Sequence, residues 1–167
     1  MSSRADCQAH ADFALVVGVV SGATLAAAGG PHISAWPGST GELYVSEKQG
    51  DMSFGTASPI VELNDAAAND IQPNVRKDGR EIVFSSNRGG GLGRPDIWSA
   101  TRASVEDPWS APINLGSNVN TSLGESRPSL SWDAEQLLFG RAGPAGTGEG
   151  GTGMSDIYVT TREKSGE

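Results

Sequence analysis

DIWSATRASVEDPWSAPINL, residues 96–115, is the stretch of sequence that decides the fold. Residues 96–102 alternate apolar and polar side chains, which predicts a half-buried β-strand, and residues 109–115 predict a second strand after a polar turn. The start of this pattern recurs as DIYVTTR at 156–162 and, less closely, as ELYVSEK at 42–48. Because one short pattern recurs along the chain, the sequence predicts a repeat protein.

Four pairs of matching residues give the length of the repeat. They are separated by 55 positions: Asp70 and Glu125, Pro73 and Pro128, Asp78 and Asp133, and Phe84 and Phe139. Later matches, such as Ile97 with Ile157, are separated by 60 positions. The difference arises because the glycine-rich segment 143–153 is about five residues longer than its counterpart near 89–93, and insertions between repeats fall in loops.

The most complete repeat predicts four strands. They cover residues 72–76, 81–85, 96–102 and 109–115. The first two are joined by Lys77-Asp78-Gly79, and Asp-Gly is a strong signal for a tight hairpin. Two earlier strands are predicted at 42–48 and 58–63, and three strands of a further repeat follow. A four-stranded antiparallel meander of this size is typical of a propeller blade.

The motifs also resemble a known family. RPSLSWDAEQLLFGR at 127–141, followed by a glycine-rich loop and SDIYVTTR at 155–162, resembles the TolB-like, WD-repeat-like β-propeller repeat. PWSAPINLGSNVNT at 108–121 is similar to the outer strand of one exported branch of that family. The resemblance covers residues 41–162 and implies a propeller, often in periplasmic, outer-membrane-associated or extracellular proteins. The chain departs from the family pattern at Ala134, where the turn glycine is expected.

The predicted fold is an all-β, incomplete β-propeller with about two to two and a half four-stranded antiparallel blades, preceded by an apolar segment. Complete propellers have about four to eight blades, so nine predicted strands do not close a ring. The chain is then a fragment of a larger propeller, a truncated gene product, or a protomer that completes a ring by self-association. A remnant without a stable fold is a further alternative, because small cores are only marginally stable.

Residues 13–28, FALVVGVVSGATLAAA, form a continuous apolar run. A membrane-spanning helix takes about 20 residues, so no stable membrane span is expected here. The length of the run and the alanines at 26–28 favour a signal peptide, although Arg4 is offset by nearby aspartates. The alternative is a buried helix or a strand-like remnant of an incomplete repeat.

Three regions are therefore predicted. Residues 1–30 are a signal peptide or an apolar N-terminal segment, 31–40 are a linker rich in turn-forming residues, and 41–167 are the partial TolB-like propeller. The protein is expected in the periplasm or outside the cell if the apolar run is a signal peptide, and in the cytoplasm otherwise.

Composition limits the classes of function. The formal net charge of -8 argues against nucleic-acid binding, which needs clustered basic residues. Cys7 is the only cysteine, so an intramolecular disulfide and a cysteine-rich zinc site are excluded, and His10 and His32 lack metal-ligand spacing. The glycine-rich segment 143–153 lacks the Lys-Ser/Thr ending of a phosphate-binding loop and precedes a strand, so it is predicted to be a flexible connection.

Paired aspartates are the first candidates for chemistry. Asp78 and Asp133 are of the residue type that glycosidases use in pairs, but they occupy equivalent hairpin turns, where aspartate accepts backbone hydrogen bonds. Asp96 and Asp156, at the starts of equivalent strands, are interpreted in the same way. No histidine lies within the repeats and no Gly-x-Ser-x-Gly motif is present, which excludes a Ser-His-Asp triad there. No catalytic, metal-binding or cofactor-binding residue is predicted.

The tryptophans are the residues best suited to stacking on a ligand. Two of them have aromatic counterparts, Tyr158 for Trp98 and Phe54 for Trp109. A large aromatic residue that recurs at one position of a repeat favours packing between blades. Trp132 lies beside a turn and has no aromatic counterpart, so it is the predicted exposed contact residue.

These observations favour a non-catalytic propeller segment that presents a surface to another protein or to a cell-envelope glycan. No nucleophile, metal or cofactor motif is found in the repeats, and the repeat motif encodes a blade and not a site. The alternative is the propeller portion of a hydrolase, a peptidase or glycoside-cleaving enzyme, whose catalytic residues lie outside this chain.

Overall fold

The structure is a computed structural model that describes residues 18–19, 41–47, 53–143 and 155–163. All regular elements in these ranges are β-strands, which confirms the predicted all-β class. The strands are β1 (Gly18–Val19), β2 (Leu43–Val45), β3 (Ser58–Pro59), β4 (Asp70–Val75), β5 (Glu81–Ser86), β6 (Asp96–Thr101), β7 (Ile113–Asn114), β8 (Glu125–Leu130), β9 (Gln136–Ala142) and β10 (Ser155–Thr161).

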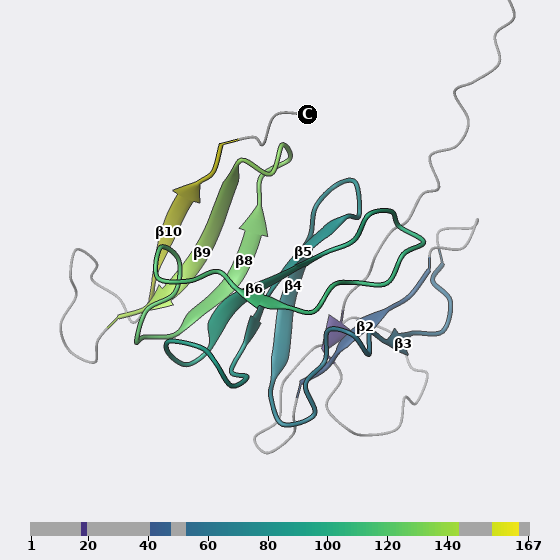
Figure 1. The fold of residues 1–167 in the computed structure, drawn as a ribbon, viewed down its shortest axis with the longest axis horizontal. Helices are drawn as coiled ribbons and strands as arrows, with labels where there is room; N and C mark the ends of the chain where they lie inside the picture. The colour runs from purple at the N-terminus through teal and green to yellow at the C-terminus, as the bar shows by residue number, and fades with distance from the viewer. Residues whose placement is uncertain (1–17, 20–40, 48–52, 144–154, 164–167) are drawn as a thin grey trace, which may run out of the picture.

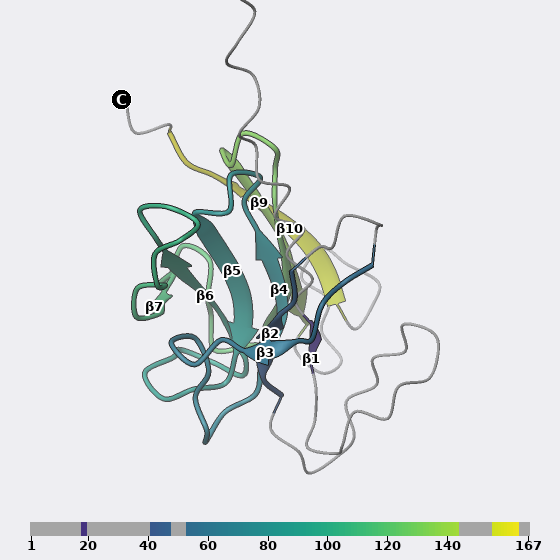
Figure 2. The same cartoon turned by 90° about the vertical axis from the view of Figure 1, so that its right-hand side faces the viewer.

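The strands form three antiparallel sheets. Their orders are β1-β2-β3, β4-β5-β6-β7 and β8-β9-β10, and none of the sheets closes on itself. Figure 1 shows them in a row, with β10 at one end and the β2–β3 pair at the other. In Figure 2 the strands β7, β6, β5 and β4 of the middle sheet lie next to one another in that order. Each sheet follows the previous one along the chain, as expected of a repeat protein.

Strand β5 explains why the middle sheet has a neighbour on each face. Successive side chains of a strand point to opposite faces of its sheet. Ile82 and Phe84 pack in a cluster with residues of the first sheet, whereas Val83 packs in a cluster with residues of the third sheet. All three side chains are buried, so both faces of the middle sheet are covered.

Two apolar clusters hold the sheets together. The first joins the first and second sheets and contains Leu43, Ile60, Leu63, Ile82, Phe84, Trp98, Ala100 and Trp109. The second joins the second and third sheets and contains Val83, Ile97, Val119, Leu137 and Phe139, with Tyr158 packed against it. The burial of Trp98 and Trp109 between two sheets confirms the packing role predicted for them. Phe54 matches Trp109 in backbone position, because the N–H of the next residue donates to the Glu47 carbonyl at 2.9 Å, as the N–H after Trp109 donates to the Thr101 carbonyl at 2.8 Å. Phe54 is exposed, however, so the shared packing role predicted for it is wrong. Arg102 covers the Trp109 ring, whereas residue 48, which aligns with Arg102, lies outside the described residues.

The repeat is also visible in the backbone. The β4–β5 ladder is interrupted by a register shift between Ile71 and Asn74, and the β8–β9 ladder by one between Ser126 and Ser129. Gln72 and Arg127 adopt φ values of 55° and 53° inside these shifts, and each is followed by a proline. Proline cannot donate to a ladder, so it is tolerated where a bulge removes the hydrogen bond. Pro73 and Pro128 therefore occupy equivalent bulges, as their spacing predicts.

The two hairpin turns are equivalent as well. The Gly79 N–H donates to the Arg76 carbonyl at 2.8 Å, and the Ala134 N–H donates to the Ser131 carbonyl at 2.9 Å. Gly79 and Ala134 both lie in the left-handed region, with φ values of 72° and 60°. A non-glycine residue pays a steric penalty there, so the turn at Ala134 is formed despite its sequence.

Gly79→Ala is expected to lower the free energy of unfolding by about 1–2 kcal/mol, the usual cost of a left-handed L-residue. The new Cβ would also lie 2.9 Å from Cγ1 of Val105. Ala134→Gly is expected to change the free energy of unfolding by less than about 1 kcal/mol, because relief of strain is offset by loss of a buried methyl group. Urea denaturation measures the free energy of unfolding of both variants. Equal losses of stability in the two would contradict the left-handed conformation of the backbone at Gly79 and Ala134.

Two predicted strands are shorter than expected. The strand predicted at 58–63 ends at Pro59, because residues 61–63 form a turn in which the Leu63 N–H donates to the Ile60 carbonyl. The strand predicted at 109–115 is regular only at Ile113–Asn114. Pro112 precedes that pair and has no N–H, and the Ser110 hydroxyl replaces a backbone acceptor for the Thr101 N–H at 3.1 Å.

An asparagine follows each shortened region, and its side chain satisfies backbone groups of an earlier strand. The Asn64 carboxamide accepts from the Leu43 N–H at 2.7 Å and donates to the Leu43 carbonyl at 3.0 Å. Asn120 makes the same two contacts with Ile97, at 2.7 and 2.8 Å. Leu43 and Ile97 are matching residues of two repeats, so this side-chain bracket is a feature of the repeat that alternation alone does not reveal.

The N-terminal run contributes one described element. Gly18 pairs with Tyr44 and Val19 pairs with Leu43, which places β1 beside β2 and makes the first sheet three-stranded. The described strands therefore number ten, one more than the nine predicted. This pairing agrees with the strand-like alternative for these two residues. The rest of residues 1–40 lies outside the described ranges, and the signal peptide stays a prediction.

Ile97 and Ile157 occupy the same register position in two sheets but differ in burial. Ile97 is paired with Ser85, and Ile157 with Gly140, which is the residue 55 positions later. Ile97 is fully buried, whereas Ile157 is 82% exposed. The third sheet covers the Ile97 face of the second, but no described segment covers the corresponding face of the third. The prediction of like surroundings for the two residues is wrong for this reason.

Candidate functional site

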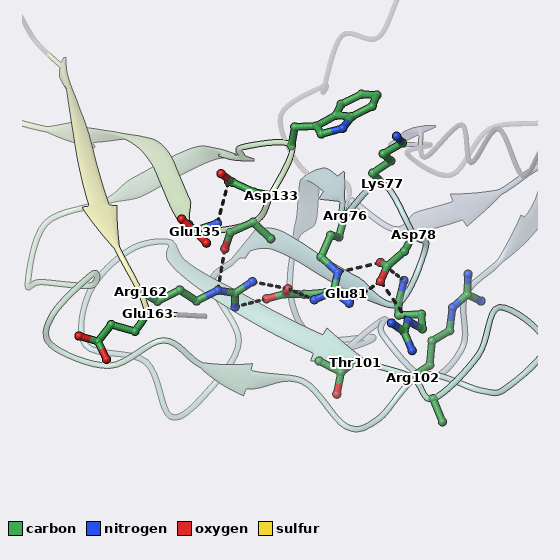
Figure 3. Close-up of a pocket in the computed structure, with 14 residues that line it drawn as sticks. Arg76, Lys77, Asp78, Glu81, Thr101, Arg102, Asp133, Glu135, Arg162 and Glu163 are labelled. Atoms are coloured by element: carbon green, nitrogen blue, oxygen red, sulfur yellow. Dashed lines mark hydrogen bonds and ion pairs between the residues drawn. The ribbon is translucent and has the colours of Figure 1, made fainter. Parts of the chain in front are cut away.

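An open cleft of about 750 Å³ lies between the β4–β5 turn and the β8–β9 turn. Its walls also include the end of β6 and the residues that follow β10. Figure 3 shows side chains of both sheets converging on this cleft. Ten lining residues are charged: Arg76, Lys77, Arg80, Arg102 and Arg162, and Asp78, Glu81, Asp133, Glu135 and Glu163. Since five are basic and five are acidic, the lining carries no net formal charge.

Glu81 is the buried anchor of the cleft. It is the first residue of β5, and Arg162 donates hydrogen bonds to both of its carboxylate oxygens, at 2.7 and 2.6 Å. Arg162 Nε also donates to the Ala134 carbonyl at 2.7 Å. The hydrogen bond with Glu81 is the main cause that raises the pKa of Arg162. These contacts join residues 81 positions apart and fix the position of the third sheet against the second (Figure 3).

Asp78 is held in its turn by two arginines. Arg76 and Arg80 both donate to its carboxylate, and the Arg80 N–H donates to Oδ1 at 3.1 Å. The hydrogen bond from Arg76, followed by those from Arg80, keeps the pKa of Asp78 well below its usual range. Its equivalent, Asp133, accepts from the Glu135 N–H at 3.1 Å and from the Ser131 hydroxyl at 2.5 Å. Both aspartates thus accept backbone hydrogen bonds in their own turns, as predicted.

The lowered pKa of Asp78 bears on whether this carboxyl group can act as a general acid. A general acid needs a pKa near the working pH, and glycosidases raise the pKa of one carboxyl group to obtain it. The surroundings of Asp78 act in the opposite direction. Asp78 therefore lacks the electrostatic surroundings of a glycosidase general acid.

Trp132 projects from the rim of the cleft and is 76% exposed. The Lys77 ammonium lies 3.9 Å from the centroid of its ring, close enough for a cation–π contact. Lys77 is the residue at the matching position of the previous repeat, so the turn forms with either side chain. The exposure predicted for Trp132 is confirmed, whereas its role as a contact residue stays a prediction. The fold does not explain why the residue is a tryptophan.

Arg102 also lines the cleft. Its Nε donates to the Gly79 carbonyl at 2.7 Å, and its guanidinium lies 4.3 Å from the centroid of the Trp109 ring. Desolvation lowers its pKa, an effect that Glu106 and Asp107 partly oppose. Within the described ranges Arg102 makes no ion pair shorter than 4.0 Å. It therefore offers hydrogen-bond donors to a polar group that enters the cleft.

Two buried acid–arginine pairs lie away from the cleft. Asp70 pairs with Arg88, and Glu125 pairs with Arg141 at 2.8 Å; both carboxylates are fully buried. Asp70 and Glu125 are one of the four pairs of matching residues separated by 55 positions. Their arginine partners were not predicted. Asp96 is also buried and accepts from the N–H groups of residues 92 and 93 at 2.5 and 3.0 Å, which closes a loop. These acids have structural roles.

Several predicted features lie outside the described residues: Cys7, His10, His32 and positions 144–154 of the glycine-rich segment. Among the residues that are described, no group of three or more His, Cys, Asp or Glu side chains is arranged to hold a metal ion. No helix in the described ranges is long and apolar enough to cross a membrane. Comparison of the chain with models of known protein families and with curated proteins found no match.

Proposed function

We propose that this chain is part of a TolB-like β-propeller that acts without catalysis, as a scaffold for binding another protein or a cell-envelope glycan. Three features support the propeller: successive antiparallel sheets packed face to face, equivalent bulges at Gln72 and Arg127, and equivalent asparagine brackets at Asn64 and Asn120. If residues 13–28 act as a signal peptide, the scaffold lies in the periplasm or outside the cell.

The observation that carries the binding role is the exposure of Trp132 at the rim of the polar cleft. An exposed indole offers a large, rigid apolar face together with one hydrogen-bond donor. Tryptophan is enriched among the residues that dominate binding energy at interfaces. Because the matching residue in the previous repeat is Lys77, the fold places no requirement for an aromatic residue at position 132.

The charged groups behind Trp132 suit a polar partner. Arg162, Glu81 and Asp78 are already fixed by hydrogen bonds, so little side-chain entropy is lost when a ligand contacts them. Arg102 adds donors that no described carboxylate occupies. A sugar ring or a peptide side chain that stacks on the indole while its polar groups enter the cleft would use both parts of the site.

Trp132→Ala is expected to weaken binding to the partner at least tenfold, because truncating a central aromatic contact commonly costs about 2 kcal/mol or more. Immobilised protein is exposed separately to the soluble-protein and peptidoglycan fractions of a cell-envelope extract, and retained material is quantified. Ile113→Ala, which truncates another exposed apolar residue that does not line the cleft, is the matched control. Unchanged retention by Trp132→Ala, or hydrolysis of either fraction by the purified protein, would contradict the proposal.

A further inference from the structure

The outer face of the third sheet is apolar and uncovered by any described segment. Leu138 of β9 and Ile157 and Val159 of β10 point to this face, and all three are exposed. The residues at the same positions in the second sheet include Val83 and Ile97, which are 1% and 0% exposed. Adjacent large apolar side chains on one sheet face mark an interaction surface.

The contact between the second and third sheets shows what covers such a face. Val83 and Ile97 are covered by the opposite face of the next sheet, which contributes Leu137, Phe139 and Tyr158. In the second and third sheets, the third strand contributes an aromatic residue to the contact with the preceding sheet. Tyr158 packs on the second cluster, and Trp98, its equivalent in the second sheet, packs in the first cluster.

The other end of the array carries the same kind of residue. Tyr44 of β2 is the equivalent of Trp98 and Tyr158, and its neighbours Leu43 and Val45 point into the first cluster. By strand alternation Tyr44 points away from that cluster, and it is a member of neither cluster. Its hydroxyl donates to Glu42 at 3.0 Å and its ring is partly exposed. Tyr44 thus lacks, among described residues, the preceding sheet that its two equivalents pack against.

Charge also differs between the uncovered face of the third sheet and the covered face of the second. Arg127, which follows Ser126 on the strand β8, is exposed and makes no ion pair shorter than 4.0 Å with a described residue. Its equivalent in the second sheet, Gln72, accepts a hydrogen bond from the next sheet at 2.9 Å. A partner for the third sheet therefore meets an exposed cation at the position where the second sheet presents an acceptor.

We propose that the uncovered face of β9–β10 in one copy of the chain binds the Tyr44 face of a second copy, head to tail. The contact repeats the packing of the third sheet on the second, with Tyr44 in the place of Tyr158. Head-to-tail contacts use two different surfaces, so they form a closed ring or an open filament. Each added copy covers an apolar face. The proposal does not depend on the Trp132 cleft, which lies at the turn ends of the sheets.

Ile157→Glu is expected to raise the dissociation constant for self-association about 100-fold, since it places a charge in an apolar contact. The solution mass of the full chain, measured by sedimentation equilibrium from about 1 to 200 µM, should rise with concentration for the wild type and for Ile113→Glu. Ile113 is an exposed isoleucine of β7 and is the matched control. Val159→Glu is the second variant of the same face. A monomeric wild type at every concentration would overturn the proposal.

Mixing tests the head-to-tail geometry. Tyr44→Lys blocks one surface and Ile157→Glu the other, so each variant alone should be monomeric, while an equimolar mixture should form a dimer and nothing larger. Circular dichroism confirms that both variants are folded, and Tyr44→Ser replaces Tyr44→Lys if it is not. A Tyr44→Lys variant that still associates alone, or a mixture that stays monomeric, would overturn the proposal. Trp132→Ala should assemble like the wild type, which separates this inference from the proposed binding function.

Discussion

Gly124→Ala is expected to destabilise the protein by about 3 kcal/mol or more, beyond the usual range for overpacking a close contact. A Cβ on residue 124 would lie 2.1 Å from the carbonyl oxygen of Arg94, which belongs to a backbone segment and cannot rotate away. Two backbone hydrogen bonds join the two segments. The Arg94 N–H donates to the Leu123 carbonyl at 3.1 Å, and the Glu125 N–H donates to the Pro95 carbonyl at 2.8 Å. The methyl group forces these segments apart and breaks the entry into β8.

Gly89→Ala is the control for this effect. No atom lies within 4 Å of the Cβ position of residue 89, so the substitution is expected to change the free energy of unfolding by less than about 1 kcal/mol. Both variants are compared with the wild type by urea denaturation followed by tryptophan fluorescence. A Gly124→Ala protein as stable as Gly89→Ala would show that the loops before β6 and β8 do not approach each other as described.

The second large effect is expected at Glu125, whose carboxylate is fully buried. It accepts hydrogen bonds from Arg141 at 2.8 Å and from the hydroxyl and N–H of Thr121 at 2.7 and 3.1 Å. Glu125→Ala leaves the Arg141 guanidinium and the Thr121 donors without these acceptors. Removing one partner of a buried ion pair costs about 3–5 kcal/mol, and thermal unfolding should show a correspondingly lower Tm.

Asp78→Ala provides the contrast. Asp78 also contacts two arginines, but at the surface, where ion pairs contribute about 1 kcal/mol or less. The contribution of Asp78 follows from its lowered pKa. It is present above the pKa of the unfolded chain and is lost as the pH falls toward the lower folded-state pKa. Equal destabilisation by Glu125→Ala and Asp78→Ala would contradict the burial of Glu125.

The order of strands was predictable because the repeat is local. Each hairpin is formed by residues close in sequence, and the Asp-Gly signal at Asp78 identifies the first of them. The 55-residue spacing then transfers that structure to the second hairpin, including the left-handed conformation of Ala134, which its side chain does not favour. Local signals and repetition agree, so most strands follow from the sequence.

The shortened strands were less predictable because side chains replace the ladder there. Asn64 and Asn120 satisfy the backbone of Leu43 and Ile97, so the following segments do not need to continue as strands. Alternation of apolar residues continues past Pro59, but the backbone turns. Asn64 and Asn120, at matching positions of two repeats, were the sequence signal for the shortened strands. Hydrophobic periodicity does not reveal them.

The candidate site was predictable only in part. Trp132 breaks the pattern of the repeat, and this identified it as an exposed residue. The Glu81–Arg162 contact joins residues 81 positions apart in different sheets and depends on how the third sheet packs on the second. Arg162 has an equivalent in Arg102, which forms no such pair in the described ranges, so repetition alone does not predict the contact.

Repeat-related sheets pack face to face through the second apolar cluster. Nuclear Overhauser effects between methyl and aromatic protons test this packing most directly. The structure predicts contacts that link Val83 or Ile97 of the second sheet to Leu137 or Phe139 of the third, and none from the outward-facing methyl group of Ile157 to the second sheet. Strong contacts within each sheet, with none between the second and third sheets, would contradict the account.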